Sequence, residues 1–155
     1  MNSLDKIIAH KTIEVAAAKA VVPVEILKQS SYFNRPTFSL KQFLLDESKT
    51  GIIAEFKRKS PSKGIINDSN SPMEIVLDYE KYGASAISIL TDKDFFGGSL
   101  DDIFCVRNHL KIPILRKDFM IDEYQFYEAK SIGADVILLI ASCLSQNQVE
   151  EFTEL

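Results

Sequence analysis

Tryptophan is absent from this sequence, and cysteine is nearly so. The two cysteines, Cys105 and Cys143, form no CxxC pair and have no histidine pair nearby, which excludes a disulfide framework and a zinc-finger type of site. We expect both to be buried free thiols. No apolar run approaches the roughly 20 residues of a membrane-spanning helix, and residues 1–10 lack the charged-then-apolar layout of a signal peptide. The sequence therefore predicts a cytoplasmic protein with no membrane partner.

An excess of charge of one sign is also missing. The formal net charge of the 155 residues is −4, and the 18 lysines and arginines are scattered along the chain. We expect no nucleic-acid partner, because proteins of that class gather their basic residues on one face. With 46% hydrophobic and 26% charged residues, the composition is that of one ordinary globular domain. The expected ligand is a small molecule.

Helical patterns fill the first fifty residues. Apolar side chains recur at helical spacing from Leu4 to Ala20. Pro23 begins a short turn that ends at Leu27, and residues 38–45 form another helical pattern. We interpret residues 1–50 as an N-terminal helical extension.

Residues 51–155 alternate between strand and helix patterns. Short apolar runs at 51–57, 86–91, 112–116 and 135–141 predict four strands, each followed by a helical pattern. The runs are almost continuously apolar, which is typical of parallel strands covered on both faces. The sequence therefore predicts an α/β fold with a parallel sheet built from βα units.

Four consecutive βα units favour a TIM (β/α)8 barrel, although an open doubly wound sheet would alternate in the same way. No GxGxxG or P-loop motif follows the first strand, which argues against a nucleotide-binding fold. A complete barrel takes about 250 residues. We therefore expect residues 51–155 to form the first half of a barrel, in a single, truncated domain. Its first and fourth strands would have unpaired edges, through which such a half could self-associate.

Polar residues at the strand ends indicate function, because barrel enzymes place their reacting groups there. Glu55 and Lys57 end the first strand and point to the same side, toward the barrel interior if Phe56 faces the helices. Burying either charge alone costs several kcal/mol. The two residues therefore form either a structural ion pair or a site for a charged substrate.

A second group of charges, Arg116, Lys117 and Asp118, ends the third strand. At least one of the two cations must point inward. A lysine in a water-poor pocket beside another cation loses proton affinity and can act as a general acid or base near neutral pH. Alternatively, these charges simply end the strand in solvent. Two lysines and a glutamate at one barrel mouth predict an anionic substrate and proton transfer.

Other candidate residues carry a weaker signal. Residues 60–64 (Ser-Pro-Ser-Lys-Gly) could bind an anion through hydroxyls and loop amides, or form an ordinary turn. Phe95 and Phe96 could supply an aromatic wall. His10 and His109 lie in helical patterns away from strand ends and are predicted to be surface or packing residues. The sequence predicts no metal site.

Three long motifs give the sequence a specific resemblance. They cover residues 53–64 (IAEFKRKSPSKG), 86–100 (AISILTDKDFFGGSL) and 113–122 (PILRKDFMID), and residues 133–140 (GADVILLI) continue the pattern. In order and spacing these motifs resemble the indole-3-glycerol phosphate synthase family. The resemblance extends over essentially the whole chain.

The resemblance implies a cofactor-free carboxy-lyase of tryptophan biosynthesis. Such an enzyme closes the ring of 1-(2-carboxyphenylamino)-1-deoxyribulose 5-phosphate, an anionic sugar phosphate, with loss of carbon dioxide and water. By motif position, the resemblance implies that Lys117 is the general acid, that Lys57 holds the substrate carboxylate and can share in proton transfer, and that Glu55 orients and polarises this pair. The implied substrate-binding residues are Ser60, for an anionic group, and Phe96 and Phe119, beside the anthranilate ring.

Two alternatives remain open at this point. The family's remaining catalytic groups belong to later strands, so the 155-residue chain could be a catalytically inactive half-barrel that self-associates. Another phosphate-binding barrel enzyme, such as phosphoribosylanthranilate isomerase, would carry different groups after its first and third strands.

Overall fold

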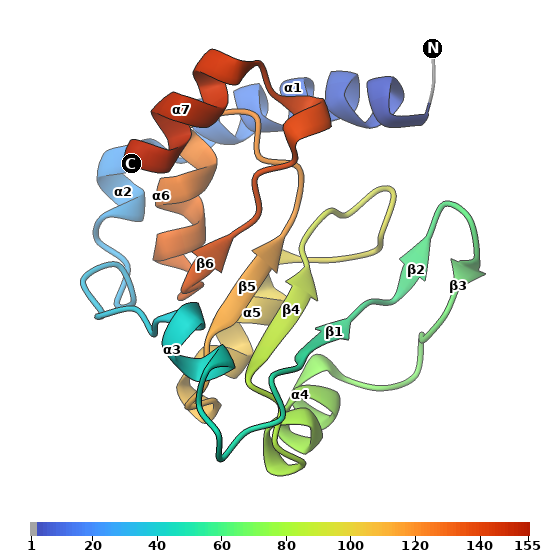
Figure 1. The fold of residues 1–155 in the computed structure, drawn as a ribbon. Helices are drawn as coiled ribbons and strands as arrows, with labels where there is room; N and C mark the ends of the chain where they lie inside the picture. The colour runs from blue at the N-terminus through green and yellow to red at the C-terminus, as the bar shows by residue number, and fades with distance from the viewer. Residues whose placement is uncertain (1–2) are drawn as a thin grey trace.

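A four-stranded parallel sheet forms the centre of the computed structural model, which describes residues 3–155 (Figure 1). Its strands are β1 (Ile53–Phe56), β4 (Ala86–Leu90), β5 (Ile114–Lys117) and β6 (Val136–Ile137), and they lie side by side in that order. A doubly wound sheet would reverse its strand order at a switch point. The unbroken order favours a barrel wall, and the predicted α/β fold with a parallel sheet is confirmed.

Helices connect the neighbouring parallel strands and cover one face of the sheet (Figure 1). They are α4 (Pro72–Lys81), α5 (Leu100–Val106) with the short 3-10 helix η1 (Arg107–His109), and α6 (Tyr124–Ser131). Gly83 and Gly133, which follow α4 and α6, have φ angles of +93° and +91°. Glycine adopts this left-handed conformation without steric cost, so these residues can end the two helices.

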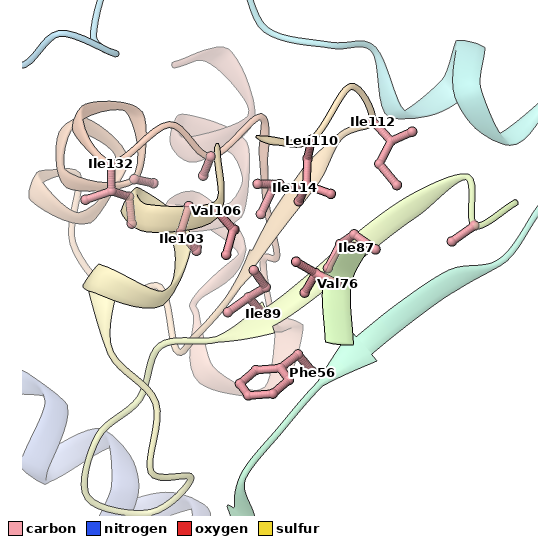
Figure 2. Packing of buried hydrophobic residues seen from close by; sticks show 13 residues of the cluster. Phe56, Val76, Ile87, Ile89, Ile103, Val106, Leu110, Ile112, Ile114 and Ile132 are labelled. Atoms are coloured by element: carbon pink, nitrogen blue, oxygen red, sulfur yellow. The ribbon is translucent and has the colours of Figure 1, made fainter. Parts of the chain in front are cut away.

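The hydrophobic core lies between the sheet and these helices (Figure 2). Its buried members include Phe56, Val76, Ile87, Ile89, Ile103, Val106 and Ile114. Because side chains alternate along a strand, burial of Phe56 on the helix side turns Glu55 and Lys57 to the opposite face. That face would be the interior of a closed barrel.

The first fifty residues form α1 (Ser3–Val21), α2 (Val24–Leu27) and α3 (Leu40–Leu44), as their helical patterns predict. α1 lies across the carboxyl ends of the strands, and α3 lies near their amino ends (Figure 1). α1 and α2 also pack against α6 through Val15, Leu27 and Tyr124. The N-terminal helices are thus joined to the sheet unit by direct packing.

A buried carboxylate fastens the segment after α2 to the sheet. Asp135 accepts hydrogen bonds from the guanidinium groups of Arg35 and Arg107, at 2.5 and 2.6 Å. It also accepts the backbone N–H groups of Phe38 and Ile114, at 2.9 and 2.8 Å. One side chain therefore links the N-terminal segment, η1 and β5.

Three local predictions are wrong. Residues 59–65, where the sequence predicts no strand, contain an antiparallel hairpin of β2 (Lys59–Ser60) and β3 (Gly64–Ile65), whose strands are too short to show alternation in the sequence. The strand expected over 135–141 is only β6, whose two residues pair with Leu115 and Arg116 of β5. Cys105 is exposed, because α5 turns Ile103 and Val106 toward the core instead, and Cys143 is half-buried.

The chain ends with the 3-10 helix η2 (Ala141–Cys143) and α7 (Gln146–Glu154). Ser145 caps α7 through a capping box with Gln148. Among residues 3–155, no helix combines the length and the apolar character needed to cross a membrane.

Candidate active site

Glu55 lies between two lysine ammonium groups on the face of the sheet opposite the helices. Its Oε1 is 3.0 Å from Lys57 Nζ, and its Oε2 is 3.5 Å from Lys117 Nζ. All three side chains are about one-third exposed, so a ligand can reach them. The structure therefore brings together the three predicted catalytic residues from the carboxyl ends of β1 and β5. With one carboxylate and two ammonium groups, the cluster is suited to an anionic ligand.

The pKa of the Glu55 carboxyl lies below its ordinary value. Partial burial raises this pKa, but the hydrogen bond from Lys57 and the positive charge of Lys117 outweigh that effect. Glu55 is therefore a fixed negative charge near neutral pH. Such a group can orient the two ammonium groups but has no proton of its own to donate.

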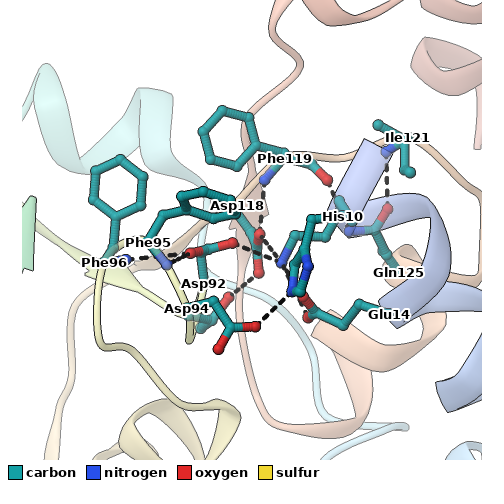
Figure 3. Close-up of polar contacts among 12 residues, drawn as sticks. His10, Glu14, Asp92, Asp94, Phe95, Phe96, Asp118, Phe119, Ile121 and Gln125 are labelled. Atoms are coloured by element: carbon teal, nitrogen blue, oxygen red, sulfur yellow. Dashed lines mark hydrogen bonds and ion pairs between the residues drawn. The ribbon is translucent and has the colours of Figure 1, made fainter. Parts of the chain in front are cut away.

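The two predicted aromatic residues lie next to each other. The rings of Phe96 and Phe119 have their centroids 6.1 Å apart and are tilted by 39° (Figure 3). Phe119 follows Lys117 by two residues, and Phe96 belongs to the loop after β4. This loop is joined to the segment after β1, because Lys59 donates its backbone N–H to Phe96 O at 3.3 Å. The two rings therefore lie over the ends of neighbouring strands.

Ser60 lies apart from this arrangement, on the β2–β3 hairpin. Its hydroxyl oxygen accepts the backbone N–H of Lys63 at 3.2 Å and is 3.4 Å from the hydroxyl of Ser62. These contacts stay within the hairpin. The structure does not place Ser60 in contact with Glu55 or the two lysines.

Lys11 is a buried charged residue that no pattern in the sequence indicates. It lies in α1 and is 1% exposed, and its ammonium group is 3.0 Å from Asp92 Oδ2 and 3.0 Å from Asp118 Oδ1. Burial alone would lower the pKa of Lys11, but Asp118, Glu14 and Asp92 together raise it above its ordinary value. Nothing local in the sequence indicates this contact, since a lysine in an amphipathic helix is usually solvated.

A second missed residue is Ser88 on β4. It pairs with Glu55 in the β1–β4 register and therefore points to the same face. Ser88 is 5% exposed, and its hydroxyl has no hydrogen-bond partner within the described chain.

The cluster of His10, Glu14 and Asp94 is the one group of described residues that could hold a metal ion, since their ligand atoms lie within 4.8 Å of one another. These atoms already have partners. His10 Nε2 is 2.5 Å from Asp94 Oδ2, and both carboxylate oxygens of Glu14 accept from Lys11 Nζ. A cation here would lie close to an ammonium group, so this cluster does not fit a metal. His10 is a partly exposed residue of a helix, as predicted, but it does not lie away from the strand ends, because it contacts Asp94 in the loop after β4.

Comparison with known proteins identifies the family of this chain. Residues 4–155 match the sequence profile of indole-3-glycerol phosphate synthase. The chain belongs to this family. The resemblance seen in its motifs is thereby confirmed, and the synthase family is favoured over the isomerase.

Individual synthases show the same relationship. The indole-3-glycerol phosphate synthase of Bacteroides thetaiotaomicron is 50% identical over 151 residues, covering 97% of this chain and 58% of that protein. That of Prochlorococcus marinus strain MIT 9215 is 44% identical over 149 residues, covering 96% and 50%. That of Carboxydothermus hydrogenoformans is 41% identical over 158 residues, covering 98% and 60%. The chain thus spans about half to three-fifths of the length of the curated synthases it matches.

Proposed function

We propose that the intact protein carrying this chain is an indole-3-glycerol phosphate synthase, with Lys117, Lys57 and Glu55 in its active site. The observation that carries the proposal is the Glu55 carboxylate, held between two ammonium groups at 3.0 and 3.5 Å on the barrel-facing side of the sheet. The family match supports the same reaction. The rest of the active site comes from the remainder of the intact protein.

In the proposed reaction, the aromatic carbon that bears the substrate carboxylate attacks the carbonyl carbon of the sugar chain. The Lys117 ammonium donates a proton to the carbonyl oxygen as the new C–C bond forms. Lys57 holds the carboxylate until it leaves as carbon dioxide, and the electrons of the broken bond restore the aromatic ring. A second protonation lets the hydroxyl leave as water, and loss of a ring proton completes the indole.

The remaining residues bind the substrate in this proposal. Phe96 and Phe119 form a wall along one side of the anthranilate ring, since their own rings lie against each other with centroids 6.1 Å apart. Ser60 offers a hydroxyl to an anionic group from the β2–β3 hairpin. A cytoplasmic location, expected from the sequence, belongs to the same proposal.

The test is turnover by the intact protein, followed through the absorbance of the indole product. Lys117→Ala should lower kcat/KM by about 10²–10⁴-fold, the usual contribution of a general acid. Lys41→Ala, at an exposed position of α3, is the control and should retain wild-type activity. Absence of product from the wild-type protein, or equal rates for Lys117→Ala and the wild type, would refute the proposal.

The outer edges of β1 and β6 support a second proposal for the 155-residue chain by itself. Neither edge is paired within residues 3–155, and unpaired strand edges favour association with another chain. We expect this chain to self-associate and to be inactive. Sedimentation and activity measurements on it test the idea, and an active monomer would contradict it.

A further inference from the structure

Lys11 of α1 joins the ends of two strands through a single buried charge. Asp92 follows β4, Asp118 follows β5, and one oxygen of each is 3.0 Å from Lys11 Nζ. Two carboxylates at this distance from one nitrogen lie within about 6 Å of each other. Like charges that close repel strongly unless a cation lies between them.

Asp92 in turn fixes the loop that carries Phe96. Its Oδ1 accepts the backbone N–H groups of Phe95 and Phe96, at 2.9 and 3.2 Å (Figure 3). Its Oδ2 has no hydrogen bond of good geometry among the described residues, so the Lys11 ammonium is the only charge compensating that oxygen there. Asp92 is completely buried. Loss of the ammonium would leave a buried carboxylate unpaired, an arrangement that proteins avoid.

Asp118 fixes the other ring in the same way. Its Oδ1, the oxygen that Lys11 contacts, also accepts the backbone N–H of Phe119 at 2.8 Å (Figure 3). Its Oδ2 accepts from Thr91 and Arg116, at 2.5 and 3.3 Å. Asp118 therefore keeps partners without Lys11, but it would lose its link to α1.

We propose that Lys11 is a positioning residue of the active site. By holding Asp92 and Asp118 side by side, its ammonium group sets the distance between Phe96 and Phe119. This distance therefore depends on the position of α1. The effect on turnover rests on the proposed synthase function, whereas the effect on the two loops does not. Lys11 acts through the carboxylates and touches no substrate.

The test compares Lys11→Met with Lys19→Met in the intact protein. Lys19 is a matched control, because it lies in the same helix and pairs with Asp122 at 2.6 Å but is 45% exposed. Three measurements are made well below the melting temperature: the amide NMR shifts of the phenylalanines that bond to Asp92 and Asp118, KM, and kcat. Lys11→Met should shift these amide signals and lower kcat/KM at least tenfold, mainly by raising KM. Lys19→Met should leave the amide shifts unchanged and kcat/KM within about twofold of wild type.

A purely stabilising role gives a different result. Lys11→Met would then lower the melting temperature but leave the amide shifts and KM at their wild-type values, and this outcome would overturn the proposal. If Lys11→Met does not fold, Lys11→Met/Asp92→Asn removes one charge of each sign and keeps an acceptor for the loop amides. This double variant should still shift the Phe119 amide and raise KM. Wild-type values for both would equally overturn the proposal.

The two proposals fail separately in this design. A wild-type protein that makes no indole-3-glycerol phosphate refutes the proposed function, and the amide shifts still decide whether Lys11 positions the loops. Wild-type turnover with unaffected loops in Lys11→Met refutes the positioning role and leaves the function intact.

Discussion

Arg116 and Lys117 are consecutive residues of β5 and lie on opposite faces of the sheet. Arg116 is 2% exposed on the helix side, where it is 2.7 Å from Glu128 and 3.3 Å from Asp118. Lys117 faces the other way, toward Glu55. The alternation of the strand thus separates two adjacent cations. Arg116 is buried in the packing between the sheet and the helices, whereas Lys117 is partly exposed on the opposite face.

This separation predicts different effects on stability. Arg116→Met should lower the free energy of unfolding by about 3–5 kcal/mol, because it removes the buried guanidinium that pairs with both Glu128 and Asp118. Lys117→Met should change it by less than about 1 kcal/mol, since Lys117 is partly exposed. Urea unfolding of the intact protein measures both values. Equal losses in the two variants would show that the two side chains do not differ in this way.

Glu55 should make stability depend on acid pH. Its pKa in the folded protein is below the ordinary value of 4.5, because Lys57 and Lys117 favour the charged form more strongly than burial disfavours it. The resulting stabilisation is therefore present above about pH 4.5 and is lost as the pH falls through the folded pKa. The free energy of unfolding should be measured for the wild type and for Glu55→Gln between about pH 6 and pH 3. The difference in this free energy between the two proteins should become smaller as the pH falls.

Removal of the main hydrogen-bond donor provides the control for this pH effect. In a Lys57→Met background, the pKa of Glu55 should be less depressed, so the pH dependence contributed by Glu55 should become weaker. If the pH dependence of stability contributed by Glu55 were the same with and without Lys57, Lys57 would not be a cause of the lowered pKa of Glu55.

Asp135 should be essential for holding residues 35–38 against the sheet. Asp135→Asn replaces one accepting oxygen by an NH2 group, which would face a guanidinium or backbone donor in a buried site. We expect a loss of about 3–5 kcal/mol in the free energy of unfolding. Asp68→Asn, in an exposed loop, should change it by about 0.5 kcal/mol or less. A similar small effect at both positions in urea unfolding would refute the prediction.

Much of the fold can be predicted from the sequence, because its signals are local. The helix ends at Gly83 and Gly133, and the serine caps of α5 and α7, depend on residues only a few positions apart. The β2–β3 hairpin and the short length of β6 could not be predicted in this way. Both depend on which backbone groups find a pairing partner, and a run of apolar residues does not contain that information.

The candidate site could likewise be predicted only in part from the sequence. The residue types at the ends of β1 and β5, and the alternation that puts Glu55 and Lys57 on one face, were determined by the sequence alone. Their meeting with Lys117, 62 positions from Glu55, required the parallel register of the strands. The contact of Lys11 with the two carboxylates was determined entirely by the tertiary structure. Only the path of α1 across the strand ends brings its ammonium group to Asp92 and Asp118, and packing between segments distant in the chain leaves no periodic pattern in the sequence.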